Sequence, residues 1–142
     1  DYILHLETDV FPPIDIIERL IFERKPIIGA LYQLSDNDSR VPMLNRISSN
    51  TDDYRVCVYG GYNNSMIKGK PVKTLSAGLG CVLIARPIFE KYKFRHIEGA
   101  SWFPDVVWIN DLYQKGTPYY AHTGIICRHK NSNWGVFGKD YN

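Results

Sequence analysis

The feature that most constrains the fold of this chain is the run Cys81–Ala85, which is apolar throughout. A strand that is apolar on both faces has to be covered on both faces of its sheet. Two glycines lie just before the run in Ala77–Gly80, and Pro87 follows it where a helix is expected to begin. The whole stretch Ala77–Ala85 is far shorter than the roughly 20 residues of a membrane-spanning helix. The run therefore predicts a buried strand, and we expect no membrane span.

Other segments of the chain have the periodicity of strands and helices. Tyr2–Leu6 and Ile27–Leu34 are β-prone runs, and the segment between them has a helical pattern that begins after Pro12 and Pro13. The apolar face expected for that helix consists of Ile14, Ile17, Leu20 and Ile21.

The second half of the chain predicts one more helix and further strands. A helix is expected from Asp105 to Lys115, with Gly116 as its left-handed C-cap. We expect a loop with a short element over residues 35–53, an edge strand from Tyr54 to Tyr59, and a final strand pair, Tyr119–Ala121 and Ile125–Cys127.

Length, charge and cysteine content exclude several classes of protein. A chain of 142 residues with 44% hydrophobic residues is long enough for one packed domain, 1–142. A net charge of +2 provides no broad basic surface, so we expect no nucleic acid partner. Cys57, Cys81 and Cys127 are widely spaced and contain no Cys-x-x-Cys pair, which favours reduced thiols in a reducing compartment, the cytoplasm.

Two carboxylates, Glu7 and Asp9, directly follow the first predicted strand and flank Thr8. In open α/β sheets, ligands bind just outside the carboxyl ends of the strands. Mg²⁺ and Mn²⁺ prefer oxygen ligands, so this pair could bind a divalent cation together with phosphate oxygens. The alternative is that both carboxylates belong to a solvated loop.

A third carboxylate, Asp105, is expected at the start of a helix, directly after Trp102, Phe103 and Pro104. It could cap the free N–H groups of that helix. It could equally be a general base beside aromatic rings that stack on a sugar.

Two histidines, His122 and His129, lie near the end of the chain, seven residues apart. His129 closes an apolar strand and is flanked by Arg128 and Lys130, which suits an anionic ligand. The alternative for each histidine is a structural role with satisfied hydrogen bonds.

The order of these features resembles that of the GT-A family of nucleotide-sugar glycosyltransferases. The resemblance covers nearly the whole chain and implies an α/β fold with a mostly parallel central sheet flanked by helices. The family's D-x-D motif matches Glu7, Thr8 and Asp9, with Glu in the first position, and implies Mn²⁺ or Mg²⁺ bridging the donor diphosphate.

The resemblance also assigns roles to residues farther along the chain. Asp105 would be the base of an inverting enzyme, and His129 would complete the metal site, with His122 as its substitute. Gly78 and Gly80 match the stretch that lines the acceptor side, where Trp102 and Phe103 would contact the sugar.

These matches predict transfer of a sugar from a nucleotide-diphosphate donor to a glycan or another hydroxyl acceptor. The family's nucleotide-binding βαβ units would precede Asp1, so we expect either an N-terminal domain or self-association through the edge of Tyr2–Leu6. The alternatives are a metal-dependent phosphoesterase and a carbohydrate-binding or interaction module that uses the 19 aromatic residues without catalysis.

Overall fold

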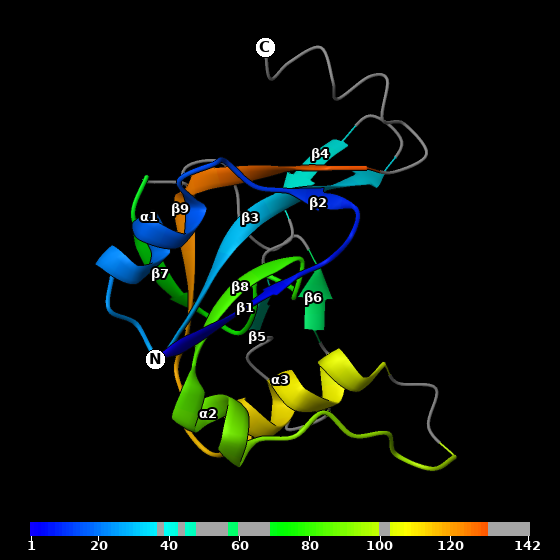
Figure 1. The fold of residues 1–142 in the computed structure, drawn as a ribbon. Helices are drawn as coiled ribbons and strands as arrows, with labels where there is room; N and C mark the ends of the chain where they lie inside the picture. The colour runs from blue at the N-terminus through cyan, green and yellow to red at the C-terminus, as the bar shows by residue number, and fades with distance from the viewer. Residues whose placement is uncertain (37–38, 43–44, 48–56, 60–68, 100–102, 131–142) are drawn as a thin grey trace.

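The computed structural model describes residues 1–36, 39–42, 45–47, 57–59, 69–99 and 103–130 of the chain. Figure 1 shows its strands and helices in chain order. They are β1 (Tyr2–Leu6), β2 (Val10–Phe11), α1 (Ile16–Phe22), β3 (Ile27–Asp36), β4 (Ser39–Pro42), β5 (Asn45–Ile47), β6 (Cys57–Tyr59), β7 (Pro71–Thr74), β8 (Cys81–Ala85), α2 (Arg86–Lys91), α3 (Pro104–Gln114) and β9 (Tyr119–His129).

The main sheet is mixed and mostly antiparallel. Its strands run in the order β1-β8-β3-β9-β2, with β4 beside β3 and β7 beside β9, while β5 and β6 form a separate pair. Among the described strands, β3 and β9 are parallel and every other pairing is antiparallel. The prediction of a mostly parallel sheet flanked by helices is therefore wrong.

The reason for this error lies in the position of β8. The succession β1, α1, β3 has the pattern of a βαβ unit, and β1 and β3 do point the same way. However, β8 lies between them and is antiparallel to both. A run that is buried on both faces does not reveal the direction of its strand, so Cys81–Ala85 predicted burial correctly and orientation wrongly.

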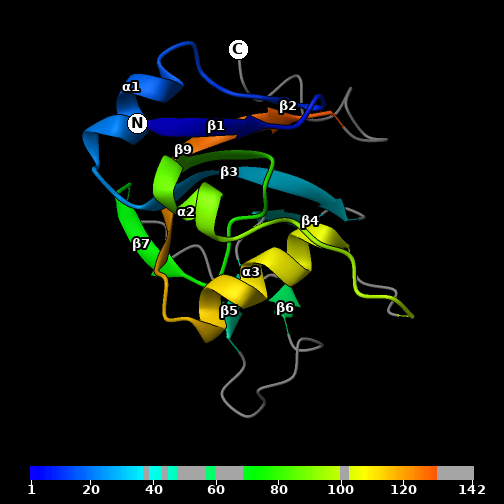
Figure 2. The same ribbon diagram turned by 60° about the horizontal axis from the view of Figure 1, so that its bottom comes forward.

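Alternating residues along β3 and β8 contribute to two apolar clusters on opposite faces of the sheet. Ile27 and Leu31 belong to the cluster beneath α3, whereas Ile28 and Ala30 belong to the cluster beneath α1. Figure 2 shows α1 on one side of the sheet and α2 and α3 on the other. None of the helices in the described part of the chain is long and apolar enough to cross a membrane.

The buried face of α1 differs from the predicted one. Ile16 and Leu20 are buried, Ile14 is fully exposed, and Ile17 and Ile21 are half-exposed. The segment carries apolar residues on more than one side of the helix, so spacing alone could not determine which side faces the sheet.

The last strand also differs from its prediction, because β9 is continuous and the expected strand pair does not form. Its register with β3 shifts between Ala30 and Leu31, where Ala30 lies opposite His122 and Leu31 lies opposite Ile126. Gly124 is in this bulge, and a Cβ atom on it would come 2.7 Å from the carbonyl oxygen of Gly69. Gly124, between the two predicted strands, therefore marks a β-bulge. The helix α3 is confirmed, and Gly116, directly after the C-cap residue Lys115, has the expected left-handed φ of +67°.

Candidate functional site

The segment after β1 is held by backbone hydrogen bonds that bring Asp9 to His129. The N–H of Glu7 donates to Gly80 (3.0 Å), and the N–H of Val10 donates back to Glu7 (3.2 Å), which closes a tight turn. Strand β2 then pairs with β9 so that Val10 lies opposite His129. As a result, Nε2 of His129 lies 3.4 Å from a carboxylate oxygen of Asp9.

Glu7 lies among four other titratable side chains. Partial burial raises the pKa of Glu7, the negative charge of Asp9 raises it further, and Asp105 adds a smaller increase. His5 and His129 act in the opposite direction on the same pKa. Negative charge from the segment after β1 and from α3 therefore gathers at one place, although α3 is distant in sequence.

Asp105 is in the first turn of α3, but it does not cap the helix. The N-cap position belongs to Phe103, which makes no side-chain cap hydrogen bond. The Oδ1 atom of Asp105 is buried and has no hydrogen-bond partner among the described residues. A buried carboxylate oxygen without a donor is costly in free energy. Helix capping therefore does not explain Asp105.

An open cavity of about 370 Å³ lies between β1 and the start of α3. It is lined by His5, Glu7, Leu79, Phe94, Phe103, Pro104 and Asp105. The ring of Phe103 is 74% exposed and can contact a ligand in the cavity. Trp102, the other aromatic residue expected to contact sugar, lies outside the described residues. The cavity therefore combines acidic groups with aromatic surface.

Two residues of this cavity, His5 and Phe94, were missed by the sequence analysis. His5 belongs to the β-prone run Tyr2–Leu6, two residues before Glu7, and both side chains line the cavity. Side chains at positions i and i+2 of a strand share one face. That alternation was the signal that could have identified His5, whereas nothing in the sequence around Phe94 distinguishes it.

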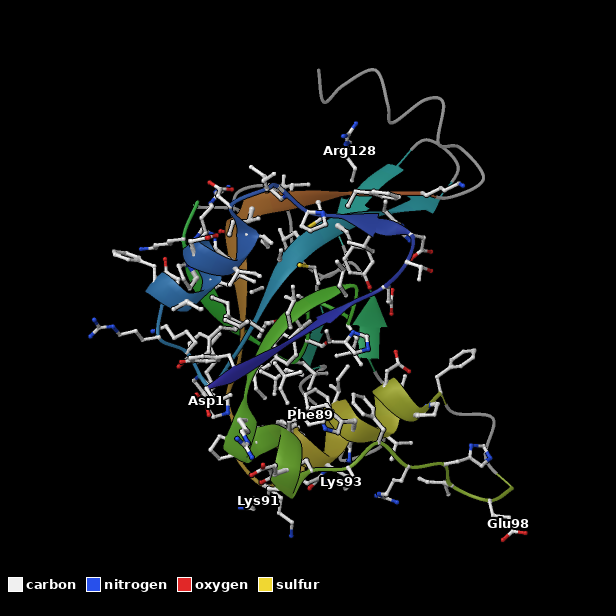
Figure 3. All side chains as sticks on the ribbon, viewed as in Figure 1. Asp1, Phe89, Lys91, Lys93, Glu98 and Arg128 are labelled. Atoms are coloured by element: carbon white, nitrogen blue, oxygen red, sulfur yellow. The ribbon has the colours of Figure 1, made fainter. Side chains whose placement is uncertain are left out.

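The remaining predicted site residues lie outside this cluster. His122 is in the other part of β9 and pairs with Glu23. Gly78 and Gly80 are buried, and Leu79 between them lines the cavity. Thr8 is exposed in the turn that carries Glu7 and Asp9. Arg128 extends away from the sheet on the side opposite α3 (Figure 3), so this basic neighbour of His129 points away from the cavity.

Tyr32 connects the interior to the site. Its ring packs edge-on against the ring of His129, with centroids 5.1 Å apart. Burial raises the pKa of the Tyr32 hydroxyl, and the nearby carboxylates of Glu7, Asp105 and Asp9 raise it further. A Cβ atom on Gly80 would come 2.5 Å from this ring, so glycine leaves the space that Tyr32 occupies. Tyr32 therefore helps to hold His129 in place.

The donor atoms at this site suit a divalent cation in part. Within the ranges that the structure describes, no three His, Cys, Asp or Glu side chains form a group that could hold a metal ion. Asp9 and His129 do place a carboxylate oxygen beside an imidazole nitrogen, and Mn²⁺ accepts both. Mg²⁺ and Mn²⁺ commonly take several ligands from water or substrate phosphate. The pair of Asp9 and His129 fits a cation whose remaining coordination positions are filled by a bound phosphate.

Comparisons with known proteins inform the fold alone. No family model matches the chain, and no curated protein matches its sequence. The crystal structure of A197 from STIV is similar, with a TM-score of 0.56 and 20% identity over 93% of this chain. This chain spans 59% of the length of that one.

Proposed function

We propose that this chain is a metal-dependent glycosyltransferase that moves a sugar from a nucleotide-diphosphate donor to a hydroxyl acceptor with inversion. One observation carries the proposal. Asp105, whose buried Oδ1 has no hydrogen-bond partner among the described residues, lines an aromatic cavity whose other wall continues, through Glu7, to the pair of Asp9 and His129. A proton acceptor and a potential cation site are thus neighbours.

Asp9 and His129 would hold Mn²⁺ or Mg²⁺, with Glu7 and the hydroxyl of Thr8 beside them. When bound, the cation would neutralise charge that develops on the leaving diphosphate. The backbone bonds of Glu7 and Val10 fix the turn that carries Asp9, and the ring of Tyr32 supports His129. These contacts keep both side chains in position before a ligand binds.

Asp105 would act as the general base toward the acceptor. The acceptor oxygen bonds to the anomeric carbon of the donor while the bond from that carbon to the diphosphate oxygen breaks. The hydroxyl proton moves to Asp105, and the bonding electron pair leaves with the diphosphate. The face of Phe103 would stack on the acceptor ring. A positioned base of this kind contributes on the order of 10² to 10⁴ in rate.

Thermal unfolding of the chain with Mn²⁺, UDP and GDP, each alone and then together, tests this proposal. Ligands that share a site stabilise the folded state more when both are present. We expect the metal with one nucleotide to raise Tm by more than the sum of the two separate shifts. Shifts that are merely additive, or the absence of any shift, would contradict the proposal. EDTA should abolish the joint effect.

The aromatic surface favours a second candidate function, carbohydrate binding without catalysis. Phe103 is largely exposed and Phe94 is partly exposed at the same cavity. Flat aromatic rings of this kind stack on sugars whether or not a reaction follows. In this case simple sugars would bind, and Mn²⁺ with UDP or GDP would add no stability.

We also propose that the reaction takes place in a reducing compartment, the cytoplasm. Cys81 and Cys127 are buried free thiols in the same apolar cluster. Reduced cysteines are the usual state in that compartment. Thiol labelling of unfolded protein purified without reductant should detect both of them as free thiols.

A further inference from the structure

His5 is held in one tautomer by a backbone hydrogen bond. Its Nδ1 lies 2.7 Å from the carbonyl oxygen of Leu79. A carbonyl oxygen can only accept, so Nδ1 carries the hydrogen and donates it. In the neutral ring, Nε2 is then an acceptor with a lone pair. Fixing the tautomer through one nitrogen is how proteins prepare the other nitrogen of a histidine for a ligand.

The position of the His5 ring is also fixed by its neighbours. Phe94 lies 6.2 Å from it, centroid to centroid, at an angle of 37°. Phe94 in turn stacks on Trp108, with centroids 5.1 Å apart, and Trp108 is fully buried in α3. Phe89 on α2, which Figure 3 labels, packs edge-on against Phe94. A chain of ring contacts thus connects the core to the cavity wall.

The polar groups of this cavity select the chemistry of its ligand. Nε2 of His5 and the carboxylate oxygens of Glu7 and Asp105 are hydrogen-bond acceptors. A ligand here must therefore donate hydrogen bonds. Phosphate offers acceptor oxygens and negative charge, and two carboxylates would repel it. A sugar ring carries several O–H donors and an apolar face for Phe94 or Phe103.

We propose that His5 binds the acceptor sugar, with Nε2 accepting a hydrogen bond from one ring hydroxyl so that a neighbouring hydroxyl faces Asp105. This inference rests on the proposed function for the role of the sugar as acceptor. It assigns the sugar to the His5 side of Glu7 and leaves the diphosphate to the side of Asp9 and His129.

Two substitutions separate the two nitrogens of His5. In His5→Asn, the side-chain amide can still donate to Leu79 but does not reach the position of Nε2. In His5→Gln, the longer side chain brings an amide oxygen near that position. The matched control is His96→Asn, since His96 is exposed and does not line the cavity.

Binding of methyl α- and β-D-hexopyranosides to the metal-free chain, followed by saturation-transfer NMR, tests the inference without any activity assay. We expect the parent chain to bind at least one of them. His5→Asn should weaken that binding by about 10-fold, the scale of one lost hydrogen bond. His5→Gln should restore part of it, and His96→Asn should leave it unchanged.

Failure to bind any methyl hexoside in the parent chain would overturn the inference, as would equal binding by His5→Asn. The joint stabilisation by Mn²⁺ and UDP or GDP should be the same in His5→Asn and parent. If that joint effect is absent from the parent while hexoside binding depends on His5, the proposed transferase function fails and the sugar site at His5 stands. If the joint effect is lost only in His5→Asn, His5 belongs to the diphosphate side and the inference fails.

Discussion

The strand β9 carries two histidines, His122 and His129, and each lies beside a carboxylate at the same distance. His129 is 3.4 Å from Asp9, and His122 is 3.4 Å from Glu23. Near His129 lie Glu7 and Asp105, whose charges act on one another and which line a cavity that His129 itself does not line. At His122 the polar groups are already satisfied by the protein itself.

The ring nitrogens of His122 face partners within the protein, although the residue also lines an open cavity of about 400 Å³ together with Asp15, Glu18, Arg19, Phe22 and Glu23. Its Nδ1 accepts the N–H of Gly124 at 3.2 Å, so Nε2 carries the hydrogen that faces Glu23. Burial lowers the pKa of His122, which favours the neutral ring. Arg19 of α1 donates to the carbonyl of Gly124 at 3.2 Å. These bonds join α1 to the bulge of β9, so we interpret His122 as structural.

Proximity of a histidine and a carboxylate is therefore weak grounds for assigning function. The two regions differ in what surrounds the pair. Near His129, burial and the charge of Asp9 raise the pKa of Glu7, and the buried Oδ1 of Asp105 has no hydrogen-bond partner among the described residues. Titratable groups with perturbed pKa values are typical of functional sites.

The largest expected effect is on turnover in Asp105→Asn, on the His129 side. The neutral amide cannot take the acceptor proton, so sugar transfer should fall by about 10² to 10⁴. The free energy of unfolding should change by no more than about 1 kcal/mol, because Asp105 makes no cap bond. Rates of transfer to a sugar acceptor, with a calorimetric melt, would check both. Asp111→Asn on the same helix, which removes only the exposed pair with Arg95, is the matched control and should keep near-parental turnover.

The second largest effect is on metal affinity, which should distinguish the pair of His129 and Asp9 from the pair of His122 and Glu23. Asp9→Asn keeps the shape but loses the charge that a hard cation requires, so Mn²⁺ affinity should fall by about 100-fold or more, at least the cost of losing a supporting group. Glu7→Gln should have a smaller effect, and Glu23→Gln should have none. Calorimetric titration with Mn²⁺ and UDP measures all three. Equal losses in Asp9→Asn and Glu23→Gln would show that the two pairs are alike.

Gly80→Ala should destabilise the region that supports His129. The new methyl group would overlap the ring of Tyr32, and overpacking of this kind costs about 1 to 3 kcal/mol. Chemical denaturation measures the loss. In a Tyr32→Ala background the same substitution should cost much less, because the ring is gone. An unchanged cost in that background would place the strain elsewhere.

The smallest effect concerns the pH dependence of His122. Its pKa in the folded state is below 6.5, so the unfolded state binds more protons between these two values. Stability supplied by the neutral ring is present above about pH 6.5 and decreases as the pH falls through the folded pKa. His122→Gln should therefore lose less stability than the parent between pH 7.5 and 5.5. Melting curves at both pH values check this, with exposed His96→Gln as a control that should follow the parent.

The sequence predicted the individual strands and helices better than it predicted how they are arranged in the sheet. The run Tyr2–Leu6, the strand Cys81–Ala85 and the helix after Pro104 are confirmed, because propensity and periodicity act over short distances. The order of the strands depends on β8 inserting between β1 and β3, a long-range pairing that no local pattern encodes. For the same reason, the burial of Ile16 in place of Ile14 could not be predicted.

Part of the candidate site could also be predicted from the sequence. Glu7 and Asp9 were identified because they follow a strand, and His129 because it ends one. The proximity of Asp9 to His129 depends on β2, a strand of two residues that is too short to predict from sequence. His5 was overlooked because a histidine within an apolar run looks like a core residue, and its hydrogen bond to Leu79 spans 74 positions of the chain.

The strand β1, which carries His5 and is followed directly by Glu7, also lies at one end of the strand order of the main sheet. Asp1 and Glu7 direct their backbone bonds toward β8, so by alternation Ile3 and His5 do the same, whereas Tyr2, Leu4 and Leu6 direct theirs outward. A strand added along that side would order β1, whose His5 lines the cavity. Assembly at this side and ligand binding in the cavity would then be thermodynamically linked, and each would strengthen the other by the same factor.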